Sequence, residues 1–318
     1  MSRHLLQRGI TVRVFTLILI LISISAAKKP FTPDYFIKKH NLKLPEITGE
    51  MLDISNHTHR SDLWEYFYVG KTDKLDSVYN YRDLQGFSVN EEFSKYEHSG
   101  DTSKVYQYSI SKKDRDTTTS YIKTITGNGL VEISHDRLRN CTWYHKKNEW
   151  GKRIYEKIKC PGDKKPRGQE FEYTHHGEYI EAIPFKRGKV DSNNIRRYYF
   201  TAYNSIVADY LVEKQKTPFL VELHLYKDKK PATVYEFSIF DTLHPIVNIY
   251  HYTYNKAGKQ QKNYFLTAVD WKNPKKGYEL ANYTEYEYDT LGRKVKASTW
   301  VVPDPEYDKI VPREGKNR

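Results

Sequence analysis

Two stretches in the C-terminal part of the chain repeat one local pattern, which constrains the fold more than any other feature. The pattern is Tyr-x-Tyr-(Asp/Asn)-x-x-Gly-(Lys/Arg), and it occupies residues 252–259 and 286–293. Side chains alternate along a β-strand, so the two spaced tyrosines lie on one strand face. Asp or Asn followed by Gly then supplies turn chemistry. Each unit therefore predicts a β-hairpin with an aromatic face, and the pair predicts an antiparallel sheet.

The residues that define the units are Tyr252, Tyr254, Asn255, Gly258 and Lys259 in the first copy, and Tyr286, Tyr288, Asp289, Gly292 and Arg293 in the second. A looser copy occupies residues 79–86. These units resemble the YD repeat of bacterial RHS-type proteins. The resemblance implies hairpin geometry and a cell-envelope or secreted setting. It covers only these short units, so it does not imply the closed shell that long arrays of the repeat build.

The first 27 residues have the pattern of a secretory signal peptide. Arg3, Arg8 and Arg13 form a positive leader before an apolar run at residues 14–25, and Ser25-Ala26-Ala27 supplies small residues for cleavage after Ala27. The apolar run is short for a bilayer span, although an uncleaved membrane anchor is the alternative. We therefore expect a secreted, periplasmic or cell-surface protein, with no transmembrane span after cleavage.

The composition indicates a basic, hydrophilic protein with a core built largely from aromatic rings. Removing the 27 residues and their three arginines from a chain of 318 residues and net charge +12 leaves 291 residues and +9. This excess favours an anionic envelope surface or a polysaccharide as partner rather than a specific nucleic acid. The chain has 28 tyrosines but only two methionines, and tyrosine combines high strand propensity with an apolar ring.

The two cysteines, Cys141 and Cys160, predict a disulfide. They flank a stretch with a turn signal at Asn148-Glu149-Trp150-Gly151, so they lie near the open end of an expected hairpin. Export to an oxidising compartment permits the bond. A pair of free buried thiols is the alternative, and the spacing does not indicate a metal site.

The mature chain divides by pattern into four parts. Residues 28–60 form an approach segment, in which Thr32-Pro33-Asp34 predicts a short helix ending near His40. Residues 61–190 are β-rich and include an Asn128-Gly129 hairpin signal. Residues 191–302 are expected to hold a helix followed by a meander, and residues 303–318 a flexible tail.

The segment at residues 192–215 carries apolar and aromatic side chains at steps of three and one, which favours an amphipathic helix packed on the sheet. Phe200 lies off the helical face and keeps a strand as the alternative. Alternation with period two then returns, and the strands expected are 219–226, 232–240, 246–254, 261–270, 280–288 and 293–302. The predicted fold is thus mainly β, with antiparallel meander sheets, tyrosine-rich hairpins and one helix.

No catalytic or metal-binding motif stands out. His57 and His59 share a strand face, and His175-His176 could add a ligand, but no carboxylate or cysteine lies at a companion spacing. The chain lacks a nucleophile elbow, a phosphate loop and an HExxH sequence. We therefore predict no cofactor, no metal and, on balance, no enzymatic activity.

These features favour an exported, non-enzymatic protein that presents a tyrosine-rich sheet for binding or scaffolding. A secreted hydrolase, with its pocket between the helix and the meander, is one alternative. An outer-membrane β-barrel is another, and charges on both strand faces, as at Glu222, His224, Glu285 and Glu287, count against it.

Overall fold

A computed structural model describes residues 30–83, 89–110, 117–126, 130–137, 139–213, 217–238, 245–270, 273 and 276–303. Several predicted features lie outside these residues. They are the signal peptide at residues 1–27, the end of the loose third unit, the Asn128-Gly129 turn and nearly all of the C-terminal tail.

The described chain contains one α-helix, α2 (Pro33–His40), a 3-10 turn, η1 (Glu50–Leu52), and many strands. The strands of the N-terminal half are β1 (His59–Tyr68), β2 (Leu75–Asp83), β3 (Val89–Ser99), β4 (Thr102–Ile110), β5 (Thr117–Thr126), β6 (Val131–Asp136), β7 (Cys141–Lys147), β8 (Arg153–Lys159) and β9 (Arg167–His175). Those of the C-terminal half are β10 (Ile180–Lys186), β11 (Lys189–Val190), β12 (Ile195–Phe200), β13 (Ile206–Val212), β14 (Phe219–Lys227), β15 (Lys230–Phe237), β16 (Ile246–Tyr254), β17 (Gln260–Ala268), β18 (Tyr278–Tyr288) and β19 (Lys294–Val301).

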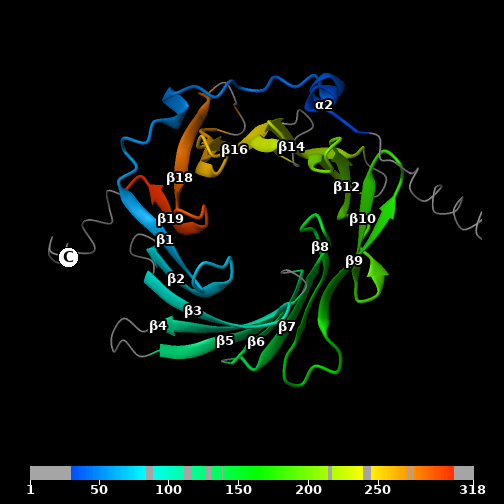
Figure 1. Ribbon diagram of the computed structural model, residues 1–318. Helices are drawn as coiled ribbons and strands as arrows, with labels where there is room; N and C mark the ends of the chain where they lie inside the picture. The colour runs from blue at the N-terminus through cyan, green and yellow to red at the C-terminus, as the bar shows by residue number, and fades with distance from the viewer. Residues whose placement is uncertain are drawn as a thin grey trace, which may run out of the picture.

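The strands form one antiparallel sheet that closes on itself. Each strand pairs with the next along the chain, β10 pairs with β12 past the two-residue β11, and β19 pairs with β1. The result is an 18-stranded barrel, seen end-on as a ring in Figure 1. Among the described strands, closure pairs the two ends of the sheet with each other, whereas an open meander would leave two strand edges exposed to aggregation. The predicted antiparallel meander is therefore present, but it is a closed barrel rather than an open sheet.

The segment at residues 192–215 corrects the sequence prediction, because it forms strands β12 and β13 rather than an amphipathic helix. Ile195 pairs with Val212 and Tyr199 with Ala208 across the hairpin. The turn between them includes Asn204, whose φ of 62° suits a left-handed turn residue and not a helix interior. Aromatic and β-branched residues dominate both arms, and their strand propensity prevails over the spacing that suggested a helix.

The six strands predicted after residue 218 are confirmed as β14 to β19, with ends that differ by at most three residues. The short helix predicted after Thr32 is confirmed as α2, which Asn41 ends with a left-handed conformation. Because β9 and β10 pair without interruption, one sheet includes both the 61–190 and the 191–302 segments.

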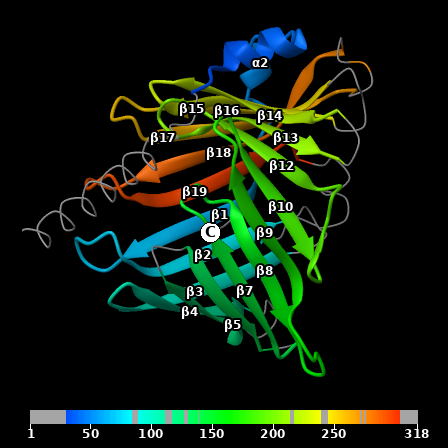
Figure 2. The same ribbon diagram turned by 90° about the vertical axis from the view of Figure 1, so that its right-hand side faces the viewer.

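One hydrophobic core lies outside the barrel, between the barrel wall and the N-terminal segment that covers it. Residues 31–57, which we call the N-terminal strap, run from α2 past the outer faces of β13 to β18 and reach β1 (Figures 1 and 2). The strap residues in this core are Phe31, Phe36, Ile37, Leu42, Leu44, Ile47, Met51, Leu52 and Ile54. They pack against outward side chains that include Tyr210, Leu220, Leu223, Tyr235, Phe237, Ile246, Ile249, Tyr264, Leu266 and Tyr283. We call strands β13 to β18 the sealed wall.

Polar contacts fix the strap at the end of α2, near its middle and at its C-terminal end. His40 Nε2 lies 2.6 Å from the Tyr210 hydroxyl, and His57 Nε2 lies 3.0 Å from the backbone oxygen of Leu280. Between them, the Tyr235 hydroxyl donates a hydrogen bond to the backbone oxygen of Pro45 at 3.2 Å. The strap thus removes the apolar outer surface of the sealed wall from solvent.

Strands β2 to β7, at residues 75–147, have no such cover among the described residues, and we call them the bare wall. Their outward side chains mix aromatic and charged residues, with Lys95 and Lys104 on neighbouring strands. Lys95 remains 44% exposed and pairs with Asp76 at 2.5 Å, while Ile133 remains 40% exposed. The outer surface of the bare wall thus carries charged side chains that water can solvate.

Candidate functional site in the barrel lumen

The inner face of the bare wall is polar and partly open to solvent. The strap marks the outer face of the barrel. Residues that pair across neighbouring strands share a face, so the pairing assigns the side chains of the other strands to the inside or the outside. Inward-facing Arg82 is 46% exposed, Glu132 34% and Lys123 30%. Side chains filling a solid core would be far less exposed. An 18-stranded ring is also wide enough to leave an aqueous channel.

One hollow of about 290 Å³ opens on this inner face. It is lined by Gln107, Tyr121, Lys123, Glu132, Ser134, Trp143 and His145, which all point inward from β4 to β7. Trp143 and His145 alternate on β7, and their rings are nearly parallel, at 12° and 6.1 Å between centroids. Ser134 donates a 2.6 Å hydrogen bond to the Glu132 carboxylate. The Lys123 ammonium lies 3.8 Å from the same carboxylate.

Next to this hollow along the ring, the turn between β7 and β8 leans inward over β9, β12 and β13. The side chain of Asn148 accepts hydrogen bonds from the backbone N–H groups of Trp150 and Lys152, and Gly151 has a φ of 73°. The ring of Trp150 packs 5.3 Å from that of Phe200 and near Tyr173. In Figure 1 this hairpin tip extends toward β12, three strands further round the ring.

The tip covers a second, inner core and a cluster of charges. The inner core consists of Ile180, Ala182, Tyr198 and Phe200, with Trp150, Tyr173 and Ile206 against it. Burial raises the pKa of the Tyr173 hydroxyl to about 12, and this hydroxyl donates to the backbone oxygen of Arg153. The tip is therefore packed in place.

Asp209 lies at the centre of the charge cluster and is fully buried. Its Oδ2 accepts a 2.8 Å hydrogen bond from Arg196 and lies 3.9 Å from Lys152 Nζ. Burial raises the pKa of the Asp209 carboxyl, although the two cations oppose that shift. Nearby, His224 lies 3.0 Å from Glu222 and lowers the pKa of that carboxyl through their hydrogen bond. Local sequence gave no signal for this cluster, because Arg196 and Asp209 meet across the β12–β13 hairpin that replaces the predicted helix, and Lys152 reaches them from the β7–β8 tip.

The predicted hairpin units lie at one rim of the barrel. Asn255 and Asp289 begin the β16–β17 and β18–β19 turns, and each accepts a backbone hydrogen bond from the Lys or Arg four residues later at 2.9 Å. Gly258 and Gly292 have φ of 72° and 75°, which favours glycine there. Tyr252, Tyr254, Tyr286 and Tyr288 point into the barrel, because they pair with inward residues of the next strand.

The second tyrosine of each unit ties its strand to the preceding strand of the barrel. Tyr254 donates to the backbone oxygen of Pro231 at 2.8 Å, and Tyr288 donates to that of Gln260 at 2.9 Å. Tyr226 on β14 and Tyr68 on β1 make the same kind of bond, to Ile206 and Lys294. Because Tyr68 bonds to β19, the pattern continues across the seam where the barrel closes.

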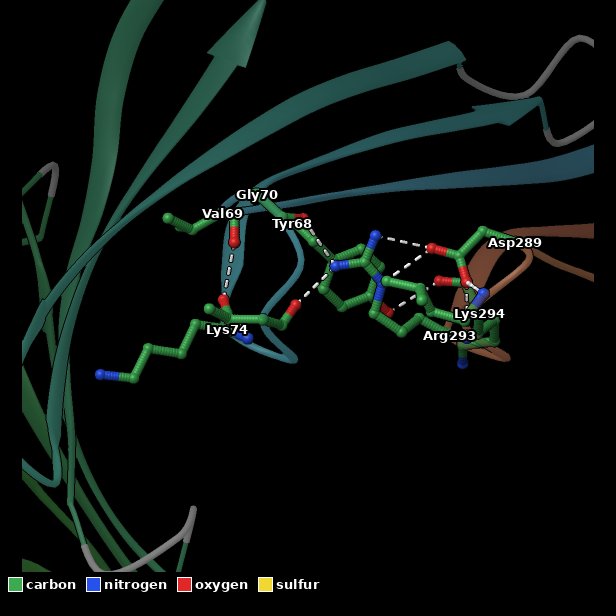
Figure 3. Close-up of polar contacts among 9 residues, drawn as sticks. Tyr68, Val69, Gly70, Lys74, Asp289, Arg293 and Lys294 are labelled. Atoms are coloured by element: carbon green, nitrogen blue, oxygen red, sulfur yellow. Dashed lines mark hydrogen bonds and ion pairs between the residues drawn. The ribbon is translucent and has the colours of Figure 1, made fainter.

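Arg293 strengthens this seam, as Figure 3 shows. Its guanidinium pairs with Asp289 at 2.7 Å and donates to the backbone oxygens of Gly70 and Thr72, in the β1–β2 turn, at 2.9 and 2.5 Å. It also lies 4.5 Å from the centre of the Tyr68 ring. These rim contacts join the two strands at which the barrel closes.

The predicted disulfide is confirmed. Cys141 at the start of β7 bonds Cys160 just after β8, and it ties the base of the hairpin whose tip carries Trp150. The histidines considered as ligands do not converge: among the residues that the structure describes, no group of three or more His, Cys, Asp or Glu is arranged to hold a metal ion. His57 instead contacts the sealed wall, 5.9 Å from the Tyr283 ring.

Within the described part of the chain, no helix has the length and apolar character needed to cross a bilayer.

Comparison with known proteins gives no family. No protein-family model matches the chain, and no curated protein does. Among solved structures, a porin-like protein from Bacteroides uniformis aligns with 76% of this chain and 96% of its own, at 8% identity and a TM-score of 0.31. TcdB2-TccC3 without its hypervariable C-terminal region aligns with 71% of this chain but 13% of its own, at 9% identity and a TM-score of 0.22. A putative 6-phosphogluconolactonase from Bacteroides fragilis has a TM-score of 0.20 at 11% identity, covering 77% and 95%. At these scores none of the three assigns a function.

Proposed function

We propose that this chain is an exported, hollow β-barrel of the cell envelope that binds a polar solute in its lumen. The observation that carries the proposal is the inner face of the bare wall, where charged and aromatic side chains line a solvent-exposed hollow between β4 and β7. Small-molecule sites are usually concave and are lined by apolar and aromatic side chains with a few convergent polar groups. The disulfide supports an oxidising, extracytoplasmic location.

The proposal replaces the open, tyrosine-presenting sheet, because the tyrosines of the repeated units point into the barrel. The hydrolase alternative required a pocket between a helix at residues 192–215 and the meander, and that helix is not formed. We therefore propose binding without catalysis, with the Trp150 tip narrowing one part of the lumen and the hollow on the bare wall serving as the binding surface.

Size-selective labelling tests whether the lumen is hollow and reached from solution. Lys123→Cys places a thiol on the inner face, and Lys104→Cys places a matched thiol outside the same wall. A small maleimide should label both variants at comparable rates, whereas a maleimide on a dextran too large to enter should label only Lys104→Cys. Failure of the small reagent to label Lys123→Cys in the folded protein would contradict a solvent-filled lumen.

An outer-membrane β-barrel is the second candidate, and closure of 18 antiparallel strands is the observation that favours it. Outward charges argue for the water-exposed form: Lys95 and Lys104 lie on the bare wall, and a lysine facing lipid at mid-depth costs about 2–4 kcal/mol. The two forms differ in their behaviour with lipid. A membrane barrel would float with vesicles and show heat-modifiable gel mobility, whereas the proposed barrel stays in the aqueous fraction without detergent.

A further inference from the structure

The hollow on the bare wall has the chemistry of a sugar-binding surface, and we propose that it binds a neutral oligosaccharide. This inference rests on the proposed solvent-filled lumen and specifies the solute. Its first support is the aromatic pair on β7: Trp143 offers a wide apolar ring, and His145 lies parallel to it two residues along. Sugar rings have apolar C–H faces that pack on such rings, while their hydroxyls turn to polar side chains at the edge.

The polar edge of the hollow suits hydroxyl groups, which donate and accept hydrogen bonds at once. Gln107 offers both an amide donor and a carbonyl acceptor, Tyr121 offers a hydroxyl, and Glu132 accepts. These groups are also held in place. Gln107 donates to Glu92 at 2.9 Å, and Tyr121 donates to Asp136 at 3.3 Å. Side chains oriented in advance lose less entropy when a ligand binds.

The charge of the hollow selects a neutral ligand. Among the described residues that line the hollow, Lys123 is the one lysine and Glu132 the one carboxylate, and they lie 3.8 Å apart, so these two charges offset each other. A different hollow, on the outside near the β8–β9 turn, shows the contrast: it is lined by Lys157, Lys165, Arg167 and Arg187 with a single carboxylate, Glu170. An anionic ligand would be drawn to that outer hollow and not to the one over Trp143.

The volume of the hollow limits how much of an oligosaccharide it can hold. A hollow of about 290 Å³ lies at the lower end of the roughly 300–1,000 Å³ of typical ligand sites. It therefore holds a short part of a chain, and the rest of an oligosaccharide continues along the inward polar side chains of the barrel.

Calorimetric titration of the oxidised, mature protein tests this proposal. The probes are three neutral hexasaccharides, of β-1,4-linked glucose, α-1,4-linked glucose and β-1,4-linked N-acetylglucosamine, with a heparin-derived hexasaccharide as the anionic comparison. We expect at least one neutral probe to bind, and Trp143→Ala to weaken it about tenfold or more. Trp143→Phe and Gln107→Ala guard against misfolding, and each should weaken binding less than Trp143→Ala. Tyr144→Ala, on the outer face of the same strand, should leave binding unchanged.

Two results would overturn the inference. One is no binding of any neutral probe by protein whose Lys123→Cys variant is labelled from solution; the lumen and the proposed function would then stand without a sugar. The other is binding of a neutral probe that Trp143→Ala and Gln107→Ala leave unaltered, which would place the sugar elsewhere. If Lys123→Cys resists labelling by the small reagent, the proposed function itself fails, and so does the inference.

Discussion

The sealed wall and the bare wall are built from the same antiparallel hairpins, yet they are stabilised differently. On the sealed wall, outward Leu223, Ile249 and Leu266 are fully buried, because the strap covers them. On the bare wall, outward side chains remain partly exposed and include charged groups. A disulfide joins the two ends of the β7–β8 hairpin, which begins at the last strand of this wall. The comparison teaches that a wide barrel does not need a filled interior. One side can be stabilised by a layer outside it, which leaves the inner face of the other side available for binding.

The largest effect should come from the strap. Phe36 is fully buried between α2 and the rings of Tyr199 and Tyr210. Replacing it by alanine removes a buried aromatic side chain and leaves a cavity, so Phe36→Ala should lower the free energy of unfolding by about 3–5 kcal/mol. Phe67, outward on β1 and 48% exposed, is the matched control, and Phe67→Ala should cost less than about 0.5 kcal/mol. Equal costs in urea unfolding would mean that the strap is not a packed layer.

The disulfide should rank next. Cys141 and Cys160 are 19 residues apart, and removing a bond that closes a loop of this size costs roughly 3 kcal/mol. The Cys141→Ser/Cys160→Ser variant should unfold at lower urea, and limited proteolysis should cut first near the β7–β8 tip. If cleavage begins instead on the sealed wall, the division between the two walls is misplaced.

The rim bonds should contribute less individually. Tyr288→Phe keeps the ring but removes the hydroxyl that donates to Gln260, so it should cost about 1 kcal/mol. Tyr106→Phe is the control on the bare wall, because its hydroxyl bonds only an exposed carboxylate, that of Glu97, at 3.2 Å. Thermal unfolding of the two variants measures the difference, and a larger loss for Tyr106→Phe would count against a structural role for the repeated units.

The smallest effect concerns acid pH. The hydrogen bond from His224 lowers the pKa of the Glu222 carboxyl below 4.5, so the folded state favours its charged form. The resulting stabilisation is present above that pH and is lost as pH falls through the lowered pKa. Glu222→Gln should therefore show a shallower loss of stability on acidification below pH 4.5 than the unmodified protein does. A curve for Glu222→Gln as steep as that of the unmodified protein would contradict this assignment.

Local patterns predicted the strands of the C-terminal half well but not the way all the strands combine. The turn residues Asn255, Gly258, Asp289 and Gly292 act on their own neighbours, and strand periodicity then places β14 to β19 within a few residues. Closure depends on pairing His59 with Val301, residues that are far apart in sequence and carry no local signal for each other. The helix at residues 192–215 was wrong because apolar spacing alone did not register the strand propensity of its tyrosines or the left-handed turn at Asn204.

The candidate site shows the same division. Cys141 and Cys160 were predictable, since a hairpin places its two ends together. Asp209 and Arg196 meet across the β12–β13 hairpin, and Lys152 joins them only because the Trp150 tip leans inward. The hollow at Trp143 exists only because four consecutive strands present one face to the lumen. Strand periodicity places Trp143 and His145 on the same face of β7, but it does not tell whether that face points into the barrel.

Hydrogen exchange tests the contrast between the two walls most directly. The unmodified, oxidised protein is measured in detergent-free buffer, with and without lipid vesicles. Amides in β14 to β18, under the strap, should exchange more slowly than those in β3 to β6, and vesicles should change neither group, because opening requires the loss of packing that only the sealed wall has. Equal protection of both walls, or protection of β3 to β6 that appears only with vesicles, would contradict a barrel with one sealed wall and one wall open to water.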